Sequence, residues 1–265
     1  MEIGISSSCY YPGDTLASLE KALDAGAPVT EVFLNTFREL EPGYVARLGE
    51  CARRRGGRIL SVHPFTSALE PFLFFSEYET RFEDGLALYR RYFEVCRLLG
   101  ASVLVFHGNM RAKALSMQEY ARRLCRLVEE GEKYGVTVAQ ENVDRCQSGD
   151  VASIRALRRY AGRPLRFVLD LKQCRRFGCD IREMADAMGP ENICHLHLSD
   201  QNERCLSALP GRGEFDFRGL FEYLREGGCT AGGVIELYRG DFGAEEELRD
   251  ALAYLSRQSP EEKTI

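Results

Sequence analysis

Short stretches rich in apolar residues alternate along this chain with longer stretches whose apolar positions recur every three or four residues. The first pattern is typical of β-strands and the second of amphipathic helices. Eight such pairs follow one another, and strands are expected at residues 2–6, 32–34, 58–63, 102–107, 135–142, 165–170, 193–200 and 232–237. Helices are expected at residues 14–26, 42–54, 78–99, 118–134, 150–160, 181–188, 217–226 and 244–255.

Continuous alternation of this length predicts the α/β class, as a single (β/α)8 TIM barrel over residues 1–258. The stretch 102–107 is almost wholly apolar, as expected for a strand buried on both faces of a parallel sheet. Residues 259–265 are expected to form a frayed C-terminal tail. The first strand is followed by neither a GxGxxG motif nor a P-loop, which argues against a nucleotide cofactor.

Composition narrows the classes of partner. The chain has 265 residues and a formal net charge of −5, which gives no overall electrostatic case for nucleic acid, so a small-molecule substrate is favoured. Ten cysteines are scattered without a CxxC motif, which indicates reduced thiols rather than a disulfide framework. The first residues lack a signal-like pattern and no run of apolar residues reaches membrane-spanning length, so we expect a cytoplasmic protein with no membrane partner.

The strand at residues 193–200 carries two of the four histidines of the chain. Its alternation places His195, His197 and Ser199 on one face. Two imidazoles on one face are a poor choice for core packing alone, although a single strand histidine is commonly a satisfied core residue. The pair therefore predicts a metal site, provided that carboxylates reach it from other strands.

Strands three to eight each end in an imidazole or a carboxylate. In chain order these residues are His63, His107, Glu141, Asp170, His197 and Glu236. The carboxyl ends of the strands form the catalytic face of a barrel. A single acidic residue at such a place often only caps the next helix, but six consecutive strands carry this chemistry. The mixture of oxygen and nitrogen ligands suits one divalent ion, Mn²⁺ or Zn²⁺ first, with Co²⁺ or Mg²⁺ as alternatives.

These strand ends resemble a known family. The segments Gln140-Glu-Asn142, Leu169-Asp170, His195-Leu-His-Leu-Ser-Asp200, Pro210-Gly-Arg-Gly213 and Val234-Ile-Glu-Leu237 are similar to those of the xylose isomerase-like TIM barrels. That superfamily comprises sugar (phosphate) isomerases and epimerases and the apurinic endonuclease barrels. The resemblance extends over essentially the whole chain.

The resemblance implies a ligand set and an activity. In the ketose 3-epimerases of this superfamily one divalent ion is held by residues that match Glu141, Asp170, His197 and Glu236. It implies a metal-dependent isomerase or epimerase of a sugar, sugar phosphate or keto-acid, in which Glu141 and Glu236 exchange the substrate proton. The chemistry is consistent, because a metal that stabilises an enediolate lets a carboxylate remove a proton beside a ketone.

The chain departs from the epimerase pattern at two positions. Gln173 stands where that pattern has a histidine, and Glu203 where it has an arginine, which Arg204 replaces one position later. Gln173 can donate a hydrogen bond to a substrate but cannot carry a proton. Lys172 and Arg204 are expected to bind an anionic or strongly hydrogen-bonding group of the substrate, and Arg175 and Arg176 are further basic candidates, with solvated loop charges as the alternative for each.

His63 and His107 leave a second function open. In endonuclease-type members, histidines at these strand ends hold a further zinc ion in a phosphodiesterase site. The set for a third metal is absent from this sequence, so both histidines are expected to bind substrate. A third alternative is a barrel that binds a sugar without turning it over.

The segment after the third strand is rich in aromatic residues. Phe65, Phe72, Phe74 and Phe75 lie within it. Such a segment suits a loop that closes over a sugar, and equally a contact in a homo-oligomer.

Overall fold

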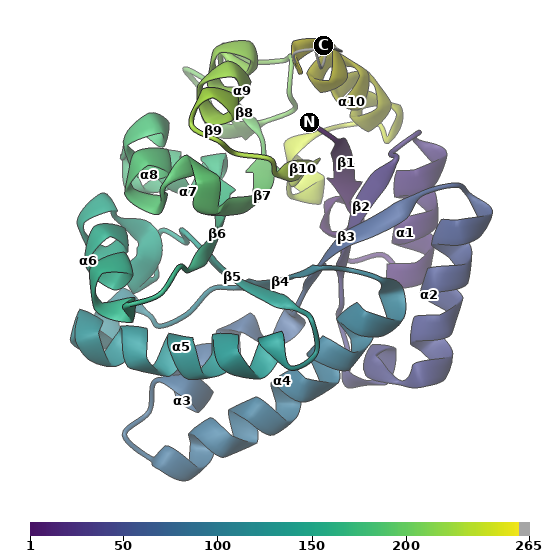
Figure 1. Ribbon diagram of the computed structural model, residues 1–265. Helices are drawn as coiled ribbons and strands as arrows, with labels where there is room; N and C mark the ends of the chain where they lie inside the picture. Colours follow the sequence, from purple (N-terminus) through teal and green to yellow (C-terminus); the bar gives the residue numbers. More distant parts are fainter. Residues whose placement is uncertain (260–265) are drawn as a thin grey trace.

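The computed structural model describes residues 1–259 as a closed barrel of eight parallel strands surrounded by helices (Figure 1). The strands follow the ring in the order β1-β10-β7-β6-β5-β4-β3-β2. The predicted (β/α)8 class is therefore confirmed. Residues 260–265 of the predicted tail lie outside the described part of the chain.

The barrel strands are β1 (Ile3–Ser6), β2 (Val29–Phe33), β3 (Arg58–His63), β4 (Val103–Phe106), β5 (Thr137–Glu141), β6 (Arg166–Asp170), β7 (Ile193–Leu198) and β10 (Gly232–Ile235). The helices are α1 (Thr15–Asp24), α2 (Pro42–Arg54), α3 (Glu70–Phe74), α4 (Glu79–Leu99), α5 (Met117–Glu132), α6 (Val151–Ala161), α7 (Leu171–Phe177), α8 (Ile181–Met188), α9 (Phe217–Glu226) and α10 (Glu246–Gln258). A two-stranded antiparallel hairpin, β8 (Asp200–Asn202) and β9 (Cys205–Ala208), stands apart from the barrel.

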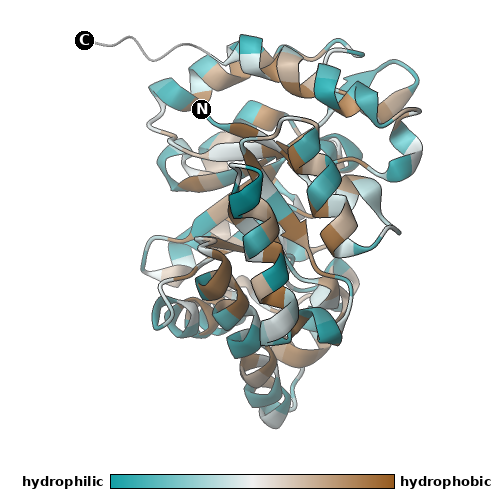
Figure 2. Ribbon diagram, turned by 90° about the vertical axis from the view of Figure 1, so that its right-hand side faces the viewer, coloured by the Kyte–Doolittle hydropathy of each residue, from teal (hydrophilic) through white to brown (hydrophobic). Residues whose placement is uncertain are grey.

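The strands contribute side chains to two separate cores, one on each face of the sheet. On β4, Leu104 and Phe106 pack into the main core between the strands and the helices, whereas Val103 and Val105 belong to a small apolar cluster with residues of β5 and β6. Because side chains alternate along a strand, this second cluster lies inside the barrel. The helices carry hydrophobic and hydrophilic residues on different faces (Figure 2). None of the helices in the described residues is long and apolar enough to cross a membrane.

The structure differs from the sequence-based expectation in three connections. The segment after β3 contains a 3-10 helix (Phe65–Leu69) and α3, the segment after β6 begins at once with α7, and the segment after β7 contains the β8–β9 hairpin. These elements are short, so few turns were present to show a periodicity. Strand β2 also begins at Val29 rather than at residue 32, which places Glu31 inside the barrel wall.

Candidate metal centre

Four predicted ligands converge where their strands end. Glu141, Asp170, His197 and Glu236 come from β5, β6, β7 and the residue after β10, and each offers one donor atom within 4.8 Å of the others. Nδ1 of His197 lies 3.2 Å from Oε1 of Glu141, 3.7 Å from Oδ2 of Asp170 and 3.4 Å from Oε2 of Glu236. Three carboxylates thus surround one imidazole nitrogen.

The backbone next to Asp170 explains its placement. Asn142, at the end of β5, accepts the Asp170 N–H at 2.8 Å and donates to the Asp170 carbonyl at 3.0 Å. Asp170 also caps α7, because its Oδ1 accepts the N–H of Gln173 at 3.0 Å. One oxygen therefore serves the helix terminus, while the buried Oδ2 has no hydrogen-bond partner and faces the cluster.

Glu141 connects the cluster to the two other histidines. Its Oε2 lies 2.8 Å from Nε2 of His107 without hydrogen-bond geometry, and the same nitrogen lies 3.0 Å from Nε2 of His63. Burial would lower the pKa of His107, but the charge of Glu141 raises it. Burial and the charge of His107 lower the pKa of His63. These opposite directions fit a hydrogen bond that His107 donates to His63.

Gly108 lets the chain turn immediately after His107. Its φ is +87°, in the left-handed region, and a Cβ there would lie 1.8 Å from the hydroxyl of Tyr120. No side chain larger than hydrogen fits this position.

The electrostatics of the cluster favour a bound cation. Burial would raise the pKa of Glu141, but His107 and His197 hold it well below the usual range, so this carboxylate is ionised. Burial raises the pKa of Asp170. Two buried oxygens, Oε2 of Glu141 and Oδ2 of Asp170, lack hydrogen-bond partners. Unpaired buried carboxylate oxygens are costly, and a divalent ion with mixed oxygen and nitrogen ligands satisfies them. The residues present therefore fit a metal ion.

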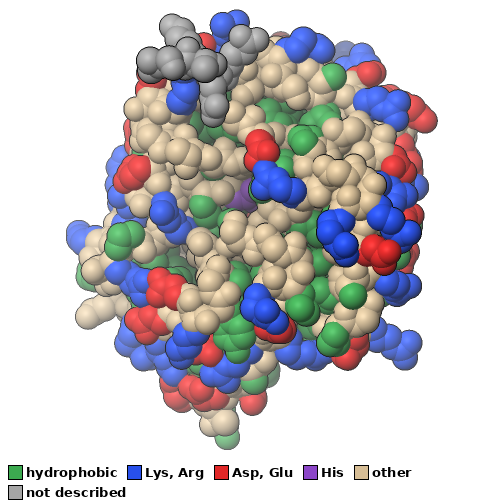
Figure 3. Space-filling view, turned by 45° about the vertical axis from the view of Figure 1, so that its right-hand side comes forward, with side chains coloured by type: hydrophobic (Ala, Val, Ile, Leu, Met, Phe, Trp, Pro, Cys, Tyr) green, Lys and Arg blue, Asp and Glu red, His purple; other side chains and the backbone are tan. Residues whose placement is uncertain are grey.

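A cavity of about 810 Å³ opens beside the cluster. Its lining includes His63, His107, Lys172 and Gln173, together with Glu141 and Glu236 of the ligand set. In Figure 3 a histidine is visible at the bottom of a hollow with charged side chains at its rim. Volumes of this size are typical of ligand-binding sites.

The predicted substrate-binding residues take different positions relative to this cavity. Oε1 of Gln173 accepts the N–H of Asp144 at 3.1 Å, and Lys172 is only 3% exposed. Arg204 instead lies exposed at the turn between β8 and β9, outside the lining of the cavity. Arg145 is a cavity residue that the sequence reasoning did not single out.

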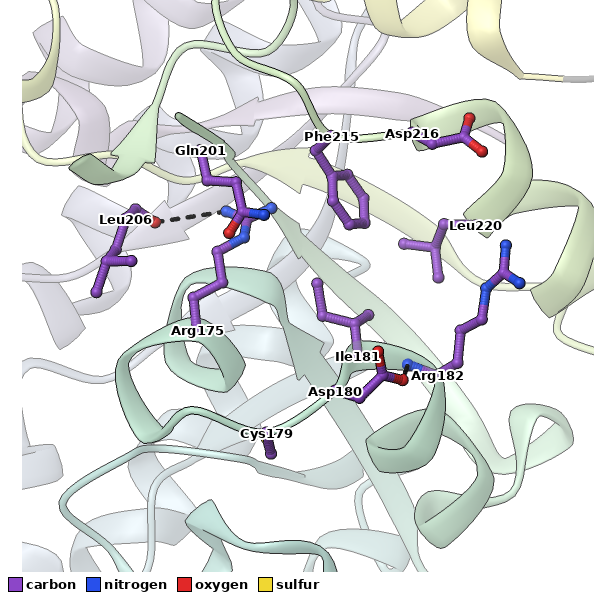
Figure 4. A pocket seen from close by; sticks show the side chains of 10 residues that line it. All are labelled: Arg175, Cys179, Asp180, Ile181, Arg182, Gln201, Leu206, Phe215, Asp216 and Leu220. Atoms are coloured by element: carbon purple, nitrogen blue, oxygen red, sulfur yellow. Dashed lines mark hydrogen bonds between the residues drawn. The ribbon is translucent and has the colours of Figure 1, made fainter. Parts of the chain in front are cut away.

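Arg175 belongs to a separate outer cavity of about 340 Å³ (Figure 4). Its guanidinium donates to the hydroxyl and carbonyl of Ser199 and to the carbonyls of Asp200 and Leu206. Arg175 therefore ties α7 to the hairpin and does not line the cavity beside the candidate metal ligands.

The aromatic segment after β3 divides between core and surface. Phe74 and Phe75 are buried in the main core, Phe65 lines the cavity, and Phe72 is 53% exposed. Buried Glu70, the first residue of α3, accepts the backbone N–H groups of His107 and Gly108 at 2.9 and 2.6 Å. The segment thus helps to position the end of β4.

A closed (β/α)8 barrel, with four side chains that could hold a metal ion converging at the carboxyl ends of its strands, defines a class of protein. The sequence model of the xylose isomerase-like TIM barrel family matches residues 19–258. The chain belongs to this family.

Solved structures of low sequence identity share the fold. D-psicose 3-epimerase with D-tagatose from Clostridium cellulolyticum H10 has a TM-score of 0.80 at 16% identity, over 97% of this chain and 99% of that one. L-ribulose 3-epimerase has a TM-score of 0.79 at 17% identity, over 97% and 94%. The IolI protein with a bound zinc atom has a TM-score of 0.75 at 18% identity, over 97% and 96%. A sequence search of curated proteins finds no match.

Proposed function

We propose that this chain is a divalent-metal-dependent isomerase or epimerase of a small carbohydrate, sugar phosphate or keto-acid. The observation that carries the proposal is the convergence of Glu141, Asp170, His197 and Glu236 around one point, with two buried carboxylate oxygens that lack hydrogen-bond partners. The fold that the chain shares with two sugar 3-epimerases and a zinc-containing relative supports it.

The proposed ion is Mn²⁺ or Zn²⁺, with Co²⁺ or Mg²⁺ as alternatives, held by these four side chains. When bound, it acts as a Lewis acid that stabilises negative charge on the carbonyl oxygen of the substrate. Glu141 and Glu236 belong to strands three positions apart around the ring. We assign one glutamate the removal of the proton from the carbon beside the carbonyl, and the other glutamate its return from the opposite side of the substrate.

His63, His107, Lys172 and Gln173 are proposed to bind the substrate, because all four line the cavity. Lys172 is proposed to bind an anionic or strongly hydrogen-bonding group of the substrate. Arg204 keeps this proposed role only if the β8–β9 hairpin approaches the cavity when substrate binds.

The test is turnover in D₂O by metal-loaded protein, screened against ketoses, keto-acids and their phosphates. Proton transfer through Glu141 and Glu236 predicts deuterium in the product at the carbon beside the carbonyl. Product without solvent deuterium would indicate hydride transfer and remove the glutamates from this role.

A second candidate function is a metal-dependent phosphodiesterase of the endonuclease type. It is supported by the grouping of His63, His107 and Glu141, whose donor atoms lie close enough to hold an ion of their own. Cleavage of abasic DNA that depends on His63 and His107 would favour this function over the isomerase.

A further inference from the structure

A second polar cluster lies inside the barrel, beside the proposed metal centre. At its middle is Glu31 of β2, which is fully buried. Its carboxylate accepts hydrogen bonds from Ser6 at 3.0 Å and Ser61 at 2.8 Å, and lies 3.2 Å from Nε2 of His195 and 3.1 Å from Nε2 of His197. These partners come from β1, β3 and β7, so Glu31 connects strands on several sides of the barrel.

The side chains around Glu31 form a hydrogen-bond network. The donor atoms of Glu31, His195 and His197 lie close enough to hold an ion. However, Oε1 of Glu31 already accepts the hydroxyl of Ser6 and Oε2 that of Ser61. Both ring nitrogens also lie within hydrogen-bonding distance of Oε2, so three of the four groups converge on this one oxygen.

The network favours one nitrogen of a neutral His197 as the carrier of its proton. Glu31 accepts the hydroxyls of Ser6 and Ser61, and an ionised carboxylate can only accept hydrogen bonds. Nε2 of His197 lies 3.1 Å from this carboxylate, so a neutral ring bonds to it only when Nε2 carries the proton. The opposite ring nitrogen, Nδ1, is the one that faces Glu141, Asp170 and Glu236.

We propose that Glu31 is a positioning residue that holds His197 with Nε2 protonated and Nδ1 presented as the metal-binding nitrogen. Its negative charge also strengthens Nδ1 as a ligand, because a hydrogen bond to a carboxylate raises the basicity of the imidazole. The inference rests on the proposed function in one respect, namely that His197 binds the metal ion.

Glu31 acts through His197 and not on the substrate. It is absent from the lining of the cavity, and its carboxylate is enclosed by side chains of the barrel. A purely structural role would affect folding but would leave metal affinity and the protonation site of His197 unchanged. These two properties therefore separate the proposal from a general contribution to stability.

The first test compares Glu31→Gln with a matched control, Glu130→Gln, in zinc affinity measured by chelator competition. Glu130 is also buried, but it pairs with Arg90 and Lys133 away from the site. Glutamine keeps the size of the side chain and removes its charge. We expect Glu31→Gln to weaken zinc binding by about 10- to 100-fold and Glu130→Gln to leave it unchanged. Equal zinc affinity in wild type and Glu31→Gln would overturn the proposal.

The wild-type measurement separates this inference from the proposed function. A wild-type chain that binds none of zinc, Mn²⁺, Co²⁺ and Mg²⁺ contradicts the metal-dependent function itself. A wild-type chain that binds zinc, with an unaffected Glu31→Gln variant, contradicts only the role of Glu31.

The second test needs no variant and so remains decisive if Glu31→Gln does not fold. Histidine-selective ¹⁵N NMR of the zinc-loaded wild-type chain reports the protonated nitrogen of each ring, and only four histidines contribute. We expect His197 to show a protonated Nε2 and a metal-bound Nδ1. A metal-bound Nε2 would contradict the proposal.

Discussion

The ammonium group of Lys172 lies 2.9 Å from Oε2 of Glu236 and 3.7 Å from Oδ2 of Asp170. A buried cation therefore sits against two of the four proposed metal ligands. Burial would lower the pKa of Lys172, but the charges of Asp170 and Glu236 raise it above its usual value, so the ammonium is charged. A metal ion bound to the same carboxylates would offset their negative charge and so stabilise the buried ammonium less. A negatively charged group of the substrate would supply the missing stabilisation.

Lys172→Met is expected to lower kcat/KM for an anionic substrate by roughly tenfold or more, corresponding to about 1.4 kcal/mol, without loss of metal. The physical reason is the loss of a buried positive charge next to the proposed substrate position. Steady-state kinetics with neutral and anionic substrates, together with metal analysis, measure the effect.

Arg176→Met serves as the control for this prediction. Arg176 contacts Tyr238, whose ring also covers the ammonium of Lys172, but it forms no ion pair with the proposed ligands. It is expected to change kcat/KM little. Unchanged kinetics in Lys172→Met would leave this lysine a structural partner of Glu236.

Asp170→Asn is expected to weaken metal binding by at least about tenfold, because one charged ligand oxygen is lost. Chelator should then lower the Tm of the wild-type chain by more than that of the variant. Bound metal contributes about 2.7 kcal/mol when its concentration is about 100 times its Kd. Thermal unfolding with and without chelator measures the difference.

Asp216→Asn is the control for the role of Asp170 as a helix cap. Asp216 caps α9 through the N–H of Gly219, as Asp170 caps α7, but lies outside the candidate metal centre. If both variants lost the same response to chelator, Asp170 would be acting through the helix and not through the ion.

The double variant His63→Gln/His107→Gln is expected to retain one metal ion per chain and to lose roughly tenfold or more in kcat/KM. Hydrogen bonds from these side chains to the substrate account for a loss of that size. Metal analysis of both proteins checks the stoichiometry. Two ions in the wild type and one in the variant would instead indicate a separate site at His63, His107 and Glu141.

Glu70 predicts a specific pH dependence of stability. Burial raises the pKa of Glu70 to about 7 in the folded chain, above its usual 4.5. Between these values the folded state holds a proton that the unfolded state has released, so stability falls as the pH rises through this window. Relative to the Glu70→Gln variant, the free energy of unfolding of the metal-free wild type should fall by roughly 1 kcal/mol per pH unit within this window.

Urea unfolding of metal-free protein at several pH values tests this prediction. Glu130→Gln is the control. Hydrogen bonds from Arg90 and Lys133 lower the pKa of Glu130, so this residue changes the stability only at a pH below the window of Glu70. Parallel stability curves for the wild type and Glu70→Gln would contradict a raised pKa of Glu70.

Periodicity was sufficient to predict the barrel because most strands and helices are long enough to show it, although only the end of β2 was located. The helices Pro42–Arg54, Ile181–Met188 and Phe217–Glu226 begin and end where proline, aspartate and glycine signals place them. Helices α3 and α7 were missed because each spans fewer than eight residues. Such short elements depend on tertiary contacts, and α7 begins directly at the strand-end Asp170.

Glu31 shows why part of the site could not be predicted. A charged residue flanked by Thr30 and Val32 was a visible signal, but the second strand was expected to begin after it. Its importance depends on Ser6, Ser61 and His197, which are far away in sequence. Nothing local identifies a carboxylate whose partners come from three other strands.

The sequence by itself determined the alternation of strands and helices, and therefore which residues stand at the carboxyl ends of the strands. Backbone periodicity is a local property, so six candidate residues could be named from it. Only the tertiary structure decided how these residues meet, because curvature and register bring Asp170 and His197 side by side on β6 and β7. It also decided that Lys172 is buried against Glu236 while Arg204 lies exposed on a hairpin, since burial depends on contacts between distant segments.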